Sequence, residues 1–119
     1  MPTFSQGDVI KVPFPYTDRP TRQSRPALVL STGGIETSHG LLWVAMITSA
    51  QNRGWPGDVP VANLRTAGLP VPSLVRTAKI ATIEAADASK LGRVSAPQLK
   101  EVIAQIIREL GGSVAPGRK

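Results

Sequence analysis

The spacing of prolines near the N-terminus is the feature that most restricts how this 119-residue chain can fold. Two runs typical of β-strands, Asp8 to Val12 and Ala27 to Ser31, flank a segment with four prolines: Pro13, Pro15, Pro20 and Pro26. Proline has no backbone N–H to donate, and a central strand does not tolerate that loss. The sequence therefore predicts a hydrophobic hairpin whose joining segment is irregular.

The joining segment is polar and rich in arginine. Its side chains are those of Tyr16, Asp18, Arg19, Arg22, Gln23, Ser24 and Arg25. Loops that hang from a rigid sheet often carry the residues that bind or catalyse. We therefore expect the functional face of the protein here.

Downstream of this hairpin, the apolar run Leu41 to Ile47 is predicted to be the central strand, with Trp43 in the core. The stretch before it, residues 32–40, is rich in turn-forming residues. Asp58 to Val61 can form only a short edge strand because Pro60 lies inside it.

Ser73 to Ile83 is predicted to be a long strand, and a β-bulge further along would shift the alternation of its faces. In the regular pattern Leu74, Arg76 and Ala78 share one face. Residues 63–67 could form one turn of helix, and residues 91–94 a short additional strand.

The clearest element is a C-terminal helix. Ser95 and Gln98 form a capping-box pattern, with Pro97 tolerated in the first turn. Apolar residues then recur at helical spacing: Leu99, Val102, Ile103, Ile106, Ile107 and Leu110. Gly111 and Gly112 end the pattern. We expect a helix that covers the sheet, a domain spanning residues 1–112, and a disordered tail from residue 113 to residue 119.

The composition limits the possible functions. The net charge of +6 and an isoelectric point near 10.6 favour a polyanionic partner, although many basic proteins bind no nucleic acid. The chain has no cysteine, which excludes disulfides, thiol chemistry and cysteine-bound zinc. No apolar run approaches the roughly 20 residues of a membrane span, and no secretion signal is visible, so we expect a cytoplasmic protein.

The sequence lacks the side chains that several kinds of catalysis require. The one histidine, His39, lies in a polar stretch and cannot form an acid–base pair of imidazoles. The eight acidic residues are scattered, without the spacing of metal ligands, and no phosphate-binding glycine loop is present. The sequence therefore predicts neither a metal nor a cofactor.

Arginine and hydroxyl chemistry remains. RNA carries its own nucleophile, the 2′-hydroxyl, so an enzyme needs only to align it and to stabilise the charge that develops on the phosphate. Guanidinium groups suit this task because they are planar, charged and bidentate toward phosphate oxygens.

The chain resembles the MazF/PemK-type toxins of bacterial toxin–antitoxin pairs. The segments that carry the resemblance are GDVIKVPFPYTD, SRPALVLS, MITSA, GLPVPSLVRTAKIATI and LGRVS, in family order from about Phe4 to Leu110. The resemblance implies a mainly β fold, a small SH3-like, strongly bent antiparallel barrel with a C-terminal helix. It also implies a homodimer and a metal-independent, sequence-selective endoribonuclease that cuts single-stranded RNA and blocks translation.

The resemblance also assigns site residues. Arg25 matches the catalytic arginine of the family and Thr48 its catalytic threonine. The expected RNA-binding residues are Arg19, Arg22, Ser24, Ser49, Gln51, Arg53 and Arg76. For Arg76 two roles stay open, a phosphate contact and an ion pair with an acid such as Asp8. Candidates for base stacking are Phe14, Tyr16 and Trp55.

The family further implies a cognate, MazE-like antitoxin whose tail would lie over the basic loops. Two other functions on such a fold are a gyrase-inhibitor-like toxin and a non-catalytic nucleic-acid-binding module. The C-terminal sequence SVAPGRK contains no aromatic residue, which argues against the gyrase inhibitors.

Overall fold

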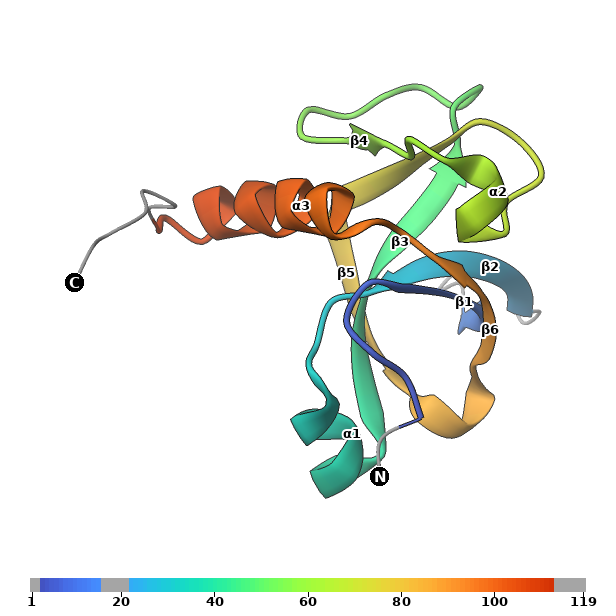
Figure 1. Ribbon diagram of the computed structural model, residues 1–119, viewed down its shortest axis with the longest axis vertical. Coiled ribbons are helices and arrows are strands. Elements are labelled where there is room, and N and C mark those ends of the chain that lie inside the picture. Colours follow the sequence, from blue (N-terminus) through green and yellow to red (C-terminus); the bar gives the residue numbers. More distant parts are fainter. Residues whose placement is uncertain (1–2, 16–21, 113–119) are drawn as a thin grey trace.

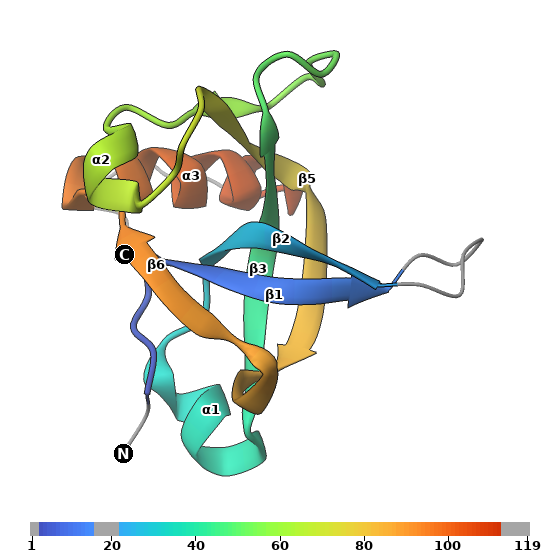
Figure 2. The same ribbon diagram turned by 90° about the vertical axis from the view of Figure 1, so that its right-hand side faces the viewer.

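A computed structural model describes residues 3–15 and 22–112 (Figures 1 and 2). The strands are β1 (Asp8–Pro15), β2 (Arg22–Val29), β3 (Leu41–Ser49), β4 (Val59–Pro60), β5 (Ser73–Glu84) and β6 (Ser89–Arg93). The helices are α1 (Gly33–His39), α2 (Leu64–Ala67) and α3 (Ala96–Glu109), with a 3₁₀ turn η1 (Ala85–Asp87). Tyr16, Arg19 and the predicted tail, residues 113–119, lie outside the described residues.

The six strands form one antiparallel sheet in the order β4-β5-β3-β2-β1-β6. Figure 2 shows β1 and β2 crossing the direction of β3 and β5, so the sheet bends sharply into a half-barrel. The predicted fold class, mainly β with a bent antiparallel sheet and a C-terminal helix, is confirmed.

Two hydrophobic clusters cover the two faces of the central strands. Because side chains alternate along a strand, Leu28, Ala45 and Ile47 pack on the face covered by α3, while Ala27 and Val29 pack on the opposite face. Strand β2 is therefore buried on both faces over residues 27–29. We call the face opposite α3 the inner face.

Helix α3 forms as the sequence predicts. The Ser95 hydroxyl accepts the backbone N–H of Gln98 at 3.3 Å and thereby caps the first turn. Val102 is fully buried against the sheet, and Leu99, Ile103 and Ile106 pack around it. The helix is a structural cover for this cluster.

The prolines of the hairpin do not exclude regular structure, contrary to our prediction. Strand β1 includes Pro13 and Pro15, and β2 includes Pro26. Strand β6 pairs with β1 only as far as Lys11, and β3 pairs with β2 only from Ala27 onward. Each proline therefore lies where one edge of its strand is open, and no ladder hydrogen bond is lost there.

Two further predictions were wrong. Residues 33–39 form helix α1 in place of turns, ended by Gly40 in the left-handed conformation (φ 69°). Trp43 is 52% exposed and is not part of the core. It shares a face with Ala45 and Ile47, but along β3 the cluster beneath α3 ends at Ala45, so the indole lies beyond this cluster.

None of the helices in the described ranges combines the length and the apolar character needed to cross a membrane.

Candidate functional site

Strand register brings Arg25 and Thr48 to the same face of the sheet. Arg25 lies opposite Val12, and Val12 belongs to the inner-face cluster. Thr48 lies two residues beyond Met46, which belongs to the same cluster. The last pair between β2 and β3 is Ala27 with Met46, so Arg25 and Thr48 each lie two residues beyond the paired part of the two strands. The two residues thus lie on the same face of the sheet, at the same end of the paired part.

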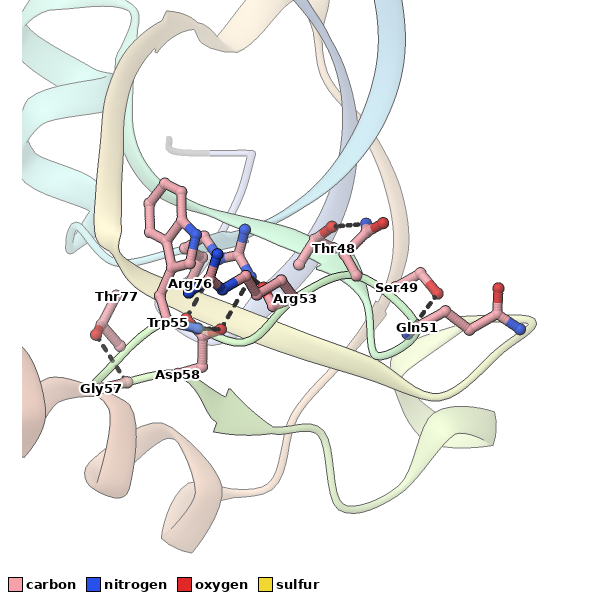
Figure 3. Close-up of polar contacts among 10 residues, drawn as sticks. Thr48, Ser49, Gln51, Arg53, Trp55, Gly57, Asp58, Arg76 and Thr77 are labelled. Carbon is pink, nitrogen blue, oxygen red and sulfur yellow. Dashed lines mark hydrogen bonds and ion pairs between the residues drawn. The ribbon is translucent and has the colours of Figure 1, made fainter.

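Thr48 is held by the turn that follows β3 (Figure 3). Its side chain is buried, and its Oγ1 accepts a hydrogen bond of 2.6 Å from Nδ2 of Asn52. The same turn is closed by Ser49, whose carbonyl accepts the N–H of Asn52 at 3.0 Å and whose hydroxyl accepts the N–H of Gln51 at 3.2 Å. Because the amide donates to Thr48, the threonine proton is left to donate elsewhere.

Arg76 is buried and forms an ion pair with Asp58. Its Nη2 lies 3.0 Å from Oδ2 and its Nε donates to Oδ1 at 3.3 Å. Nη2 also donates to the carbonyl of Arg53 at 2.7 Å. Of the two roles open for Arg76, this arrangement supports the ion pair, but Asp58 is the partner. Asp8 instead lies near Lys90 and Arg93 of β6, at 3.5 and 3.8 Å.

The same ion pair fixes the loop between β3 and β4, residues 50–58, which we call the β3–β4 loop. The Asp58 carboxylate accepts the backbone N–H of Trp55 at 2.9 Å, and the Trp55 carbonyl accepts the N–H of Asp58 at 3.1 Å. The indole of Trp55 lies over the Arg76 guanidinium, 4.1 Å from ring centroid to Cζ. Thr77 donates to the Gly57 carbonyl at 2.9 Å and anchors the end of the loop.

The remaining predicted site residues are distributed over the two strand ends and this loop. Gln51 and Arg53 are exposed in the β3–β4 loop. Ser24 is exposed but alternates with Arg25, which directs its side chain to the opposite face. Arg22 pairs with Pro15 at the start of β2, and Arg19 lies outside the described residues.

Sequence analysis missed Asn52 and Asp58. Asn52 could have been found from its position four residues after Thr48, at the end of a short turn. Asp58 has no local signal, because its partner Arg76 lies on a strand 18 residues further along.

The predicted site residues lie outside the described cavity. The described cavity, lined by Asn63, Arg93 and Gln98 among others, lies between α2, β6 and α3 and contains none of the predicted site residues. Within residues 3–15 and 22–112, no three His, Cys, Asp or Glu side chains group as metal ligands do. Asp58 neutralises the charge of Arg76 on this face.

A bent six-stranded antiparallel half-barrel with an arginine and a threonine on the same face defines a small basic β-protein. The family model described as PemK-like, MazF-like toxin of type II toxin–antitoxin system matches residues 5–110. The chain belongs to this family.

Solved structures of several toxins are similar to the chain. One is the MazE–MazF complex (form II) of Deinococcus radiodurans, with 27% identity, 92% of this chain and 96% of that chain covered, and a TM-score of 0.70. Another is the Mycobacterium tuberculosis toxin MazF-mt6, with 25% identity, coverages of 87% and 97%, and a TM-score of 0.67.

A mycobacterial endoribonuclease in complex with its cognate antitoxin has a TM-score of 0.74 at 16% identity, with coverages of 97% and 100%, and shows the fold alone. A search of curated proteins gave no match.

Proposed function

We propose that this toxin is a metal-independent, sequence-selective endoribonuclease that cleaves single-stranded RNA through the 2′-hydroxyl and thereby inhibits translation. The observation that carries the proposal is the placement of Arg25 and Thr48 on the same, inner face of the sheet. An arginine and a hydroxyl on one face can orient a phosphate and stabilise its developing charge when the substrate supplies the nucleophile.

The proposed roles follow from the two side chains. The Arg25 guanidinium donates to the non-bridging phosphate oxygens, where negative charge accumulates as the 2′-oxygen attacks. Thr48 accepts from Asn52, so its own hydroxyl proton is directed toward the phosphate or the 2′-hydroxyl. Attack forms the 2′-oxygen to phosphorus bond and breaks the bond to the 5′-oxygen. The 2′-hydroxyl proton passes to water and the leaving 5′-oxygen takes a proton from water, so the products are a 2′,3′-cyclic phosphate and a 5′-hydroxyl.

The proposed partners follow from the family and the neighbours. The 27% identical Deinococcus toxin was solved with MazE, which supports a MazE-like antitoxin as the partner of this chain. A homodimer in the cytoplasm is the assembly we propose. An acidic antitoxin segment could lie over the face that carries Arg25 and Arg53 and exclude RNA.

The test is RNA cleavage in the presence of EDTA. Wild-type protein, Arg25→Ala and Arg108→Ala are incubated with a long single-stranded RNA, and fragment ends are mapped. Arg108 is an exposed arginine near the end of α3, so its removal controls for the loss of one positive charge. We expect discrete cuts with 2′,3′-cyclic phosphate ends from wild-type and Arg108→Ala, and none from Arg25→Ala.

Two outcomes would contradict the proposal. Intact RNA with folded, antitoxin-free wild-type protein would indicate a binding protein, such as a gyrase-inhibitor-like toxin or a nucleic-acid-binding module. Equal cleavage by wild-type and Arg25→Ala would indicate a different catalytic centre.

A further inference from the structure

Trp55 is an exposed aromatic residue in a fixed position. It is 42% exposed, yet both its backbone N–H and its carbonyl bond to Asp58, at 2.9 and 3.1 Å. The indole lies on the Arg76 guanidinium, which covers one of its faces. The exposed part of the residue is available to a ligand. A large apolar ring held rigidly in water has no role in the core of the described structure.

Arg76 supports the ring from beneath. Its guanidinium is held by two hydrogen bonds to Asp58 and one to the carbonyl of Arg53, and its side chain is 9% exposed. The guanidinium is therefore fixed in orientation, and the indole that lies on it is fixed as well. We call Trp55, together with Arg76 and Asp58 that support it, the Trp55 platform.

The Trp55 platform lies next to the proposed catalytic threonine. Thr48 pairs with Leu74 across the sheet, and Arg76 follows two residues later on the same face. Residues related in this way are diagonal neighbours, whose Cα atoms typically lie about 7–8 Å apart. Figure 3 shows Thr48 and the Trp55 indole on the two sides of Arg53, with Arg76 beneath the loop.

We propose that the Trp55 platform stacks a nucleobase of the RNA, one nucleotide away from the phosphate held by Arg25 and Thr48. The proposal rests on the proposed function and adds a base site to it. Bases stack on exposed aromatic rings whatever their sequence, and a cation on the far side of the indole is compatible with a neutral base but not with a cationic ligand. Arg53, exposed on the same loop, can reach the adjoining phosphate.

The binding test uses a mixed-sequence single-stranded RNA pool with 2′-O-methyl groups, which lacks the nucleophile and stays intact. The chain has two tryptophans, so Trp43→Phe leaves Trp55 as the sole indole fluorophore. We expect saturable quenching of Trp55 fluorescence by the pool. Trp55→Ala should weaken binding by about 10-fold, Trp55→Phe should retain most of the affinity, and Trp43→Ala should change nothing.

Arg76 acts as a positioning residue, and its test separates this role from mere stability. The pair Arg76→Met with Asp58→Asn removes the support without leaving a lone buried charge. We expect a folded protein with a raised KM and an unchanged kcat. Adding Trp55→Ala to this pair should cause little further loss, because the platform is already disordered.

Three results would overturn the inference. RNA cleavage and binding by Trp55→Ala equal to wild-type would remove the base site while the proposed endoribonuclease stands. Trp55 fluorescence that depends on protein concentration, and not on RNA, would assign the platform to contact with a second copy of the chain. If the loss of activity in the triple variant equals the sum of the losses from Trp55→Ala and from the pair Arg76→Met with Asp58→Asn, Arg76 is not a positioning residue. Failure of wild-type to cleave RNA would instead contradict the proposed function, whatever the fluorescence shows.

Discussion

The guanidinium of Arg76 and the carboxylate of Asp58 form a buried ion pair, with Nη2 and Oδ2 3.0 Å apart and both side chains less than 10% exposed. Removing one member leaves the other charge buried without a partner, which typically costs 3–5 kcal/mol. We therefore expect Arg76→Ala to lower the free energy of unfolding by about 3 kcal/mol. Urea denaturation of Arg76→Ala, Asp58→Ala and the double variant checks this. A double variant that loses the sum of the two single losses would show that the pair is not coupled.

The amide of Asn52 sets the direction in which Thr48 donates its proton. Thr48→Val removes the hydroxyl and should lower kcat for RNA cleavage by about 100-fold, the usual loss for one transition-state hydrogen bond. Asn52→Ala should lower kcat by less than Thr48→Val does. Asn52→Asp should lose more than Asn52→Ala, because a carboxylate would accept the Thr48 proton and also repel the phosphate. Single-turnover cleavage rates give the comparison, and an Asn52→Asp variant as active as wild-type would refute the assigned direction.

Gly92 permits a close approach between β6 and α2. A Cβ at Gly92 would lie 2.3 Å from the carbonyl oxygen of Thr66, a backbone atom that cannot move aside. We expect Gly92→Ala to destabilise the protein by about 3 kcal/mol. Gly34→Ala is the matched control, since a Cβ there meets nothing within 4 Å and should stabilise α1 by up to about 1 kcal/mol. Thermal denaturation distinguishes the two, and similar melting temperatures would contradict the prediction.

Glu36 links helix α1 to the N-terminal segment. Partial desolvation raises the pKa of its carboxyl, but hydrogen bonds from the N–H groups of Phe4 and Thr3, at 3.0 and 2.8 Å, outweigh this and lower the pKa below its ordinary value of 4.5. A carboxyl with a lowered folded-state pKa stabilises the protein above its unfolded-state pKa. That contribution is lost as the pH falls through the folded-state pKa.

The pH prediction for Glu36 follows from this sign. Wild-type should be more stable than Glu36→Gln at neutral pH, and the difference should shrink as the pH falls below 4.5. Urea denaturation of both proteins across this range measures the difference. A difference that grows on acidification would show that the protonated carboxyl is the stabilising form.

The sequence predicted the elements whose signals are local. Helix α3 was visible from its cap and apolar spacing, and β3 from its apolar run, because each pattern lies within one element. Helix α1 was missed because it has no buried face and depends on Glu36 reaching the N-terminal segment. Trp43 is exposed because the cluster covered by α3 does not extend to it. The extent of that cluster cannot be predicted from a local sequence pattern.

The candidate site was predictable only in part for the same reason. Arg25 and Thr48 were assigned by resemblance, and their placement on one face depends on the register of β2 with β3. The support of Trp55 by Arg76 and Asp58 joins a loop and a strand that are distant in the sequence. Such contacts follow from topology, and a single sequence does not specify topology locally.

The bulge in β5 divides the strand into two parts that present different sets of side chains to the inner face. Arg76 pairs with Met46 and Ile80 with Ala45, so residues 77–79 have no partner on β3. Beyond the bulge, Ala81 and Ile83 pack in the inner-face cluster, whereas before it the inner face receives Leu74 and Arg76. Because side chains alternate along a strand and the bulge inserts an odd number of residues, even-numbered positions face inward before the bulge and odd-numbered positions face inward after it. Within the bulge Ala78 and Lys79 are exposed, so the bulge should tolerate substitutions at these two positions. The length of the bulge is the constrained property. Losing or gaining one residue there would point either Arg76 or the apolar half of the strand to the wrong face.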